Sequence, residues 1–85
     1  MATQAEFEEA VERSKTLAAR PSNDVLLQLY GLYKQATDGD VHTERPGGFD
    51  FKNIAKWDAW KGQEGKSQEA ARAEYVQLVN DLSGK

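Results

Sequence analysis

The sequence predicts a small all-α domain of four helices, and three observations support this fold class. Apolar residues recur at steps of three and four in four separate segments, as they do on one face of a helix. The two prolines, Pro21 and Pro46, both lie between these segments. No window shows the sustained apolar–polar alternation of a strand. At 85 residues the chain has room for one domain, so we expect a single domain over 1–85.

The first helix is predicted over about residues 4–19. Thr3 followed by Glu6 matches a capping box, in which each side chain accepts from the other residue's free backbone N–H. The apolar face of this helix is expected to hold Phe7, Ala10, Val11, Ser14, Leu17 and Ala18.

The second helix is predicted over about residues 22–38, with Ser22 as its N-cap and Gly39 as its stop signal. Its main apolar stripe consists of Leu26, Leu29, Tyr30 and Tyr33, and it is widened by Val25, Leu32 and Ala36. This is the broadest apolar face in the chain, so we expect this helix to be the most buried.

Two further helices follow a long connection that ends near Asp50. A connection of about a dozen residues is long for so small a domain, and such loops are often functional or packed against the body. The third helix is predicted over about 51–62, closed by Gly62 and Gly65. The fourth is predicted from the N-cap Ser67 to about residue 82.

Composition excludes several classes of protein. Hydrophobic residues make up 39% of the chain, which is typical of a folded domain, and there is no cysteine for a disulfide or a thiolate metal site. The net charge is −3, so a general basic field for nucleic acid is absent and no nucleic-acid partner is expected. The first residues lack the basic start and apolar run of a signal peptide, and no segment is apolar enough to span a membrane. We therefore expect a cytoplasmic protein with no stable membrane insertion. It should be a monomer, since no heptad seam is left over.

Two short motifs imitate ligand sites but lack required residues. Gly65, Lys66 and Ser67 resemble the end of a phosphate-binding loop, yet Trp60 stands where that loop needs its first glycine. Ser67 is better explained as a helix cap.

The second imitation is an acidic stretch that resembles a calcium loop and holds Asp38, Asp40, His42 and Glu44. Counted from Asp38, its sixth position is Thr43 instead of glycine and its twelfth is Phe49 instead of glutamate. His42 is the only histidine and is expected to be exposed or to pin the loop. We expect no metal site, no catalytic residue and no enzymatic activity.

One cluster remains as a candidate binding site. Tyr30, Tyr33 and Lys34 are spaced by three and four residues, which puts them on one side of the second helix. A tyrosine ring can stack on a base and its hydroxyl can donate to an anion, while lysine supplies a compact charge for phosphate. The alternative is that both rings belong to the core and Lys34 is solvated. Lys15, Lys56 and Arg20 would add positive charge only if the fold brings their segments together.

The chain resembles the acyl-CoA-binding protein family over nearly its whole length. The resemblance lies in Tyr-Gly-Leu-Tyr-Lys-Gln-Ala-Thr-Asp-Gly-Asp at 30–40, Thr-Glu-Arg-Pro-Gly at 43–47 and Ala-Lys-Trp-Asp-Ala-Trp at 55–60. It implies an up-down-down-up four-helix bundle. It also implies one medium- or long-chain acyl-CoA thioester bound per monomer, with no catalysis and no further cofactor. Enzymes that use acyl-CoA are implied partners.

The resemblance also assigns roles to individual residues. Tyr30, Lys34 and Lys56 would hold the 3′-phosphate of the ligand. The adenine site would be lined by Tyr33 and Lys15, with Gly31 and Leu32 on the adjoining wall and Tyr75 contributed by the last helix. Phe7 and Leu29 would border the acyl chain.

The chain departs from the family pattern at Val11, Gly48, Arg72 and 61–64. Gly48 and Arg72 motivate an alternative hypothesis. In that hypothesis the bundle has lost its ligand and works as a helical protein-interaction module.

Overall fold

A computed structural model describes residues 2–84. It contains the helices α1 (Gln4–Ser14), α2 (Asn23–Asp38), α3 (Phe51–Lys61) and α4 (Gln68–Leu82), and no strand occurs between residues 2 and 84. The all-α prediction is confirmed. The helices form a flat body with extents of 39 × 28 × 15 Å, so a large part of each helix lies near a surface.

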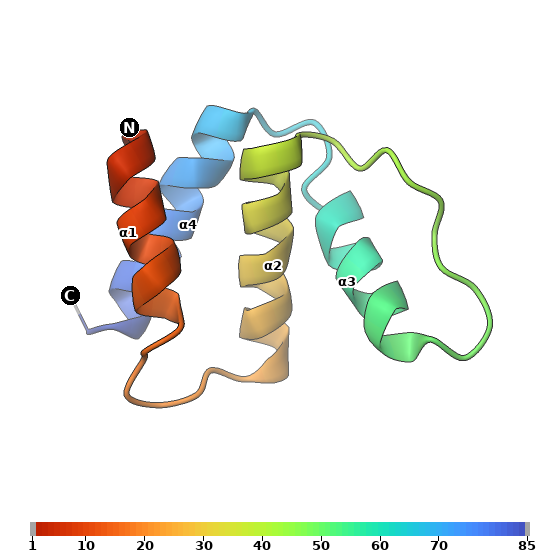
Figure 1. The fold of residues 1–85 in the computed structure, drawn as a ribbon, viewed down its shortest axis with the longest axis horizontal. Helices are drawn as coiled ribbons and strands as arrows, with labels where there is room; N and C mark the ends of the chain where they lie inside the picture. Colours follow the sequence, from red (N-terminus) through yellow and green to blue (C-terminus); the bar gives the residue numbers. More distant parts are fainter. Residues whose placement is uncertain (1, 85) are drawn as a thin grey trace.

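The order of the helices in space differs from their order in the chain (Figure 1). α1 and α4 run in one direction and α2 and α3 in the other, which gives the expected up-down-down-up topology. α2 packs on α3 and on α4, and α4 packs on α1. Because α2 and α3 are parallel, the connection 39–50 has to run back along the length of the bundle. α2 is therefore the central helix on which a site could be assembled.

Local signals place most of the helix ends. Thr3 and Glu6 form the predicted capping box, and Ser22 and Ser67 accept from backbone N–H groups of the first turns of α2 and α4. Gly39 ends α2 with φ +80°, a conformation that costs glycine little because it has no Cβ. The ends of α2, α3 and α4 lie within about one residue of the prediction.

The predicted end of the first helix is wrong. α1 stops at Ser14, with Lys15 as its C-cap, instead of continuing to residue 19. The Ser14 hydroxyl donates to the Val11 carbonyl at 2.6 Å, a local bond that competes with helical hydrogen bonding, and residues 15–22 then connect α1 to α2. Leu17 is consequently a half-buried turn residue and is not part of a helical face.

Only part of the wide apolar face of α2 is buried in the core. This helix contributes more buried residues than any other, as predicted, and they are Leu29, Gly31, Leu32, Gln35 and Ala36. However, Leu26 and Tyr30 are only half-buried and Tyr33 is 38% exposed. The apolar stripe therefore continues beyond the core to the surface.

The long connection is fastened to α3 by side chains. Its hydrogen bonds are Trp60 Nε1 to the Gly39 carbonyl (2.7 Å), Trp57 Nε1 to the Thr43 carbonyl (3.0 Å), and Arg45 to both carboxylate oxygens of Asp58 (2.9 Å each). The exposed ring of His42 lies edge-on to Trp60, with the ring centroids 5.4 Å apart. The connection is thus held along α3, and His42 helps to hold it.

Candidate ligand-binding site

A pocket of about 320 Å³ opens where α1, α2 and α4 meet. We call it the aromatic pocket, and it is lined by Val11, Ser14, Lys15, Leu26, Leu29, Tyr30, Tyr33 and Tyr75. Four of these, Lys15, Tyr30, Tyr33 and Tyr75, were predicted as site residues from three distant parts of the sequence. The fold brings these four together.

Three aromatic rings pack against one another at the aromatic pocket, and two of them, Tyr33 and Tyr75, line it. Phe7 lies parallel to Tyr33 (centroids 6.0 Å apart, 22° between planes) and edge-on to Tyr75 (5.2 Å). Phe7 and Tyr75 are buried, while Tyr33 is the exposed member. Tyr33 therefore offers a ring face that is supported from behind, a suitable platform for another flat ring.

Tyr75 is fixed by its hydroxyl group, which donates to the Ser14 hydroxyl at 3.0 Å. Burial raises the pKa of the Tyr75 phenol, so it stays neutral at physiological pH. Lys15 is exposed, and its ammonium lies 3.4 Å from Glu12. An exposed pair of this kind is worth little, so Lys15 is free to turn toward an anion in the pocket.

A second pocket, of about 360 Å³, lies between α2 and α3. We call it the basic groove, and it is lined by Arg20, Asn23, Leu26, Leu27, Tyr30, Lys52, Ala55 and Lys56. Three cations surround a floor of aliphatic side chains. Tyr30 and Leu26 line both pockets, so the aromatic pocket and the basic groove adjoin each other at these two side chains of α2.

Two of the three residues predicted to hold a phosphate lie together. The Lys56 ammonium is 5.4 Å from the centroid of the Tyr30 ring, a cation–π contact between α3 and α2. The third residue, Lys34, is turned elsewhere. Its ammonium forms an ion pair with Asp38 and lies 4.8 Å from the centroid of Trp60.

The hydrogen bond from Lys34 to Asp38 raises the pKa of the lysine. Lys34 lies one turn beyond Tyr30 on α2, as Trp60 lies one turn beyond Lys56 on the parallel α3. Lys34 is therefore a neighbour of the Tyr30–Lys56 pair, but its ammonium is engaged by Asp38 and the Trp60 ring.

Other residues with predicted roles are largely buried, although Leu29 still lines the aromatic pocket. Leu32 is 1% exposed, Phe7 2% and Leu29 6%. Gly31 faces α3, where an added Cβ would overlap the carbonyl oxygen of Ala59 and lie 2.8 Å from its carbonyl carbon. Gly31 thus permits the close approach of α2 and α3 that forms the floor of the basic groove.

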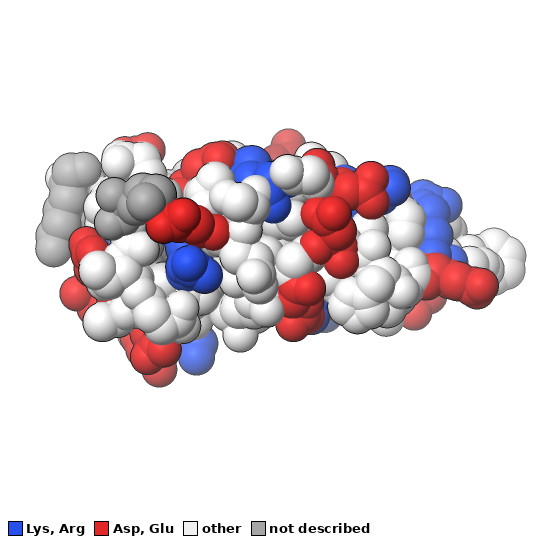
Figure 2. All heavy atoms as spheres, turned by 90° about the horizontal axis from the view of Figure 1, so that it is seen from above, with Lys and Arg blue, Asp and Glu red and all other residues white. Residues whose placement is uncertain are grey.

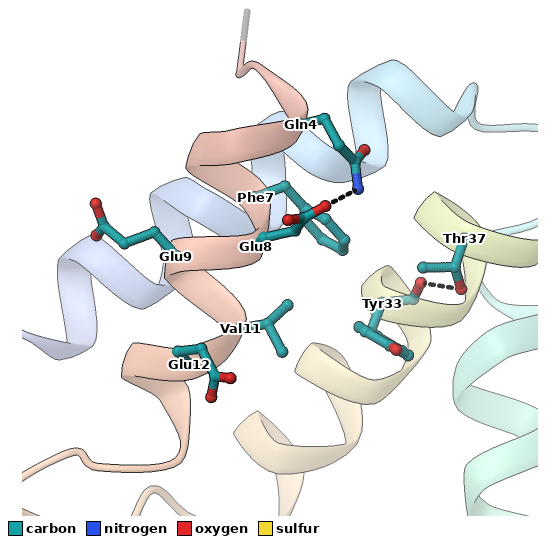
Figure 3. A pocket seen from close by; sticks show the side chains of 8 residues that line it. All are labelled: Gln4, Phe7, Glu8, Glu9, Val11, Glu12, Tyr33 and Thr37. Carbon is teal, nitrogen blue, oxygen red and sulfur yellow. Dashed lines mark hydrogen bonds between the residues drawn. The ribbon is translucent and has the colours of Figure 1, made fainter.

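A third pocket, of about 550 Å³, lies between α1 and α2 beside the aromatic pocket (Figure 3). It shares Val11 and Tyr33 with that pocket. Phe7 and Val11 point from α1 toward α2, while Glu9 points away. Three glutamates line this space, so it is a poor place for a phosphate. Acidic side chains also outnumber basic ones on the end of the molecule drawn in Figure 2.

Some lining residues were not assigned a role from the sequence. Lys52 lies four residues before Lys56, so the two share a face of α3, and this spacing could have identified it. Arg20 was considered only as a charge that the fold had to bring in. The fold brings Arg20 to the basic groove through the turn after α1. Helical periodicity does not extend into this turn, so it could not predict where Arg20 lies.

The two segments that resemble a phosphate-binding loop and a calcium loop form hydrogen bonds, an ion pair and a helix cap within the fold. The backbone N–H of Gly65 donates to Asp40 at 2.9 Å, Lys66 binds Glu74, and Ser67 caps α4. Within residues 2–84 no group of His, Cys, Asp or Glu is arranged to hold a metal ion, and no helix is long and apolar enough to cross a bilayer.

Comparisons with known proteins give one consistent result. Residues 4–79 match the family model described as acyl CoA binding protein. An acyl-CoA-binding protein from Gossypium hirsutum is 56% identical over 82 residues, which cover 96% of this chain and 92% of that protein. The crystal structure of Oryza sativa acyl-CoA-binding protein 2 superposes with a TM-score of 0.89 at 57% identity, covering 93% of this chain and 88% of the other. The corresponding structure from Moniliophthora perniciosa gives 0.90 at 42% identity, covering 95% and 80%.

Proposed function

The chain belongs to the acyl-CoA-binding protein family, and we propose on this basis that it binds medium- and long-chain acyl-CoA thioesters, one per molecule, without catalysis. The observation that carries the proposal is that the aromatic pocket and the basic groove adjoin each other at Tyr30 and Leu26. A ligand with a flat base, phosphates and an apolar tail needs these three surfaces side by side.

The nucleotide half of the ligand fits the aromatic pocket. The adenine would stack on the exposed face of Tyr33, which Phe7 and Tyr75 support. Lys15 would leave Glu12 and bind a phosphate oxygen. Hydrogen bonds to charged groups contribute about 1.5–3 kcal/mol each.

The 3′-phosphate would be held by Tyr30 and Lys56, which already lie in contact. Lys34 would join them after leaving Asp38. Two ammonium groups and one phenol on a single phosphate supply several kcal/mol even in a protein whose net charge is −3.

The acyl chain fits the floor of the basic groove, formed by Leu26, Leu27 and Ala55. Burial of an apolar chain is worth about 0.8 kcal/mol per CH₂, so eight covered methylenes give roughly 6 kcal/mol before ordering costs. Gly31 and Leu32 would act indirectly, by fixing the distance between α2 and α3. Leu29 would form part of the wall of the aromatic pocket, and Phe7 would support Tyr33 from behind.

Titration calorimetry with acyl-CoAs of increasing length tests the proposal. Affinity should rise with each added pair of methylenes until the groove is full, while free CoA binds weakly and free fatty acid very weakly. No heat with any member of the series would support the alternative, a helical interaction module without a ligand. Loss of the thioester over hours at stoichiometric protein would show catalysis instead.

We further infer that the protein is a cytoplasmic monomer that hands its ligand to acyl-CoA-using enzymes. A carrier has to diffuse between its donors and its acceptors, and one chain supplies every residue of the proposed site. Light scattering of the liganded protein and fractionation of the source cells would check these two points.

A further inference from the structure

Two large apolar side chains lie almost fully outside the fold. Phe49 is 90% exposed and Phe51 is 69% exposed, and their rings pack edge to face with centroids 6.1 Å apart. Apart from Tyr33 in the aromatic pocket, they are the exposed large hydrophobic residues of the described chain. We call this pair the phenylalanine tip.

The phenylalanine tip lies where the long connection meets the start of α3 (Figure 1). The preceding Gly48 has φ +70°, a left-handed turn conformation that directs the chain into the tip. This end of the bundle is remote from α1 and α4. Seen from above, uncharged atoms project beyond the charged ones at the end of the body where α3 lies (Figure 2). The rings thus form a small convex apolar surface rather than a groove.

The tip has basic neighbours on α3 and one acidic neighbour, Asp50, which lies between the two phenylalanines in the sequence. Lys52 follows Phe51 directly, and together with Lys56 and Arg20 it lines the basic groove. Within residues 2–84, neither Lys52 nor Lys56 forms an ion pair. The nearest acid in the sequence, Asp50, accepts a hydrogen bond from Asn53 at 2.8 Å. Unpaired cations beside exposed rings are complementary to a surface that is both negative and apolar.

We propose that the phenylalanine tip docks the protein reversibly on an anionic lipid bilayer. The two rings enter the headgroup region, where aromatic side chains are favoured, and Lys52 and Lys56 contact lipid phosphates. A convex pair of rings suits a deformable lipid interface. It is far smaller than the roughly 800 Å² per partner of a typical stable protein interface.

The rest of the molecule keeps this contact weak and oriented. Because the net charge is −3, a negative surface repels the molecule as a whole, which favours the orientation that presents Lys52 and Lys56. The docking geometry brings the mouth of the basic groove to the bilayer without any helix entering it. The proposal concerns the unliganded protein and does not depend on the ligand proposed above.

Sedimentation with lipid vesicles tests the proposal. The full-length chain at low ionic strength should bind vesicles of mixed phosphatidylcholine and phosphatidylserine, and bind vesicles of phosphatidylcholine alone far less. Phe49→Ser combined with Phe51→Ser should lower the partition coefficient about tenfold, and Lys52→Gln about fivefold, as expected for roughly 1 kcal/mol per surface charge. Lys61→Gln, at the other end of α3, is the matched control and should change nothing.

A depth measurement separates ring insertion from simple charge attraction. The chain has no cysteine, so Phe49→Cys can be labelled with an environment-sensitive fluorophore at one site, and Gln77→Cys on α4 serves as the control. Emission should shift to the blue on anionic vesicles only for the label at 49. Circular dichroism will show that the exposed substitutions leave the fold intact.

Three results would overturn the proposal. They are the absence of vesicle binding at excess anionic lipid, unchanged partition of the double phenylalanine variant, and equal emission of the two labels. Concentration-dependent dimers that disappear in the double variant would instead assign the tip to a second copy of the chain.

Discussion

Lys34 and Asp38 form an ion pair along one turn of α2, and this pair holds the lysine at the edge of the proposed site instead of inside it. The ammonium group of Lys34 is engaged by this carboxylate and by the Trp60 ring, whereas the Tyr30 ring is contacted by Lys56. A ligand phosphate would have to compete with Asp38 for this cation. Asp38 should therefore set part of the affinity without touching the ligand.

Replacing Asp38 by asparagine should tighten acyl-CoA binding about two- to fivefold, since a partly exposed ion pair of this kind is worth up to about 1 kcal/mol. Calorimetry with one acyl-CoA measures the change. Asp81→Asn on α4 is the control. An equal gain for 3′-dephospho-acyl-CoA would contradict the phosphate role of Lys34.

Lys56→Ala should weaken acyl-CoA binding by about 1.5–3 kcal/mol, the value of a hydrogen bond to a charged group. The loss should be much smaller for the ligand that lacks the 3′-phosphate. Lys61→Ala removes a lysine from the same helix and should have no effect. Equal losses for both ligands in Lys56→Ala would mean that this lysine contacts another part of the ligand.

Gly31→Ala should destabilise the fold by about 1–3 kcal/mol, because the new Cβ would overlap the backbone of Ala59 and push α2 and α3 apart. Urea unfolding measures the change. The matched control is Gly62→Ala, where the nearest atoms would lie 3.5 Å from the added Cβ. If Gly31→Ala is as stable as the control, the helices do not approach as described.

Asp40 should make the stability of the fold depend on pH in the acid range. Hydrogen bonds from the Gly65 N–H (2.9 Å) and the Gln35 side chain (2.8 Å) hold the pKa of Asp40 below its ordinary value of 3.8. A group with a lowered pKa stabilises the fold above that ordinary value, and the stabilisation is lost as pH falls through the lower one. Asp40→Asn should therefore reduce the loss of melting temperature between neutral pH and about pH 2. An acid profile identical to that of the original chain would show that Asp40 adds nothing to it.

The sequence predicted the helices well because their signals are local. Thr3, Ser22 and Ser67 act within one turn of the helix that each begins. The end of α1 was missed because periodicity continues through Leu17, whereas the helix stops at Ser14. No glycine or proline lies directly after Ser14, so the sequence carries no stop signal at this end.

The candidate site was harder to predict because its parts come from four helices and a turn. Spacing alone put Tyr30, Tyr33 and Lys34 on one side of α2, but it could not show that Asp38 captures Lys34 or that Lys56 reaches Tyr30. Residue spacing also could not show which apolar residues of α2 are buried in the core and which line the pockets. Leu32 belongs to the core, while Leu26 lies at the junction of the aromatic pocket and the basic groove.

The most direct test of the proposed site is a titration of the ¹⁵N-labelled protein with acyl-CoA, followed by backbone amide shifts. The account predicts shifts at Lys15 and Tyr33 on one side of α2 and at Leu27 and Ala55 on the other, with those of Leu27 and Ala55 growing as the acyl chain lengthens. The account would be contradicted by shifts confined to the outer face of α4, or by shifts at Leu27 and Ala55 that do not change with the length of the acyl chain.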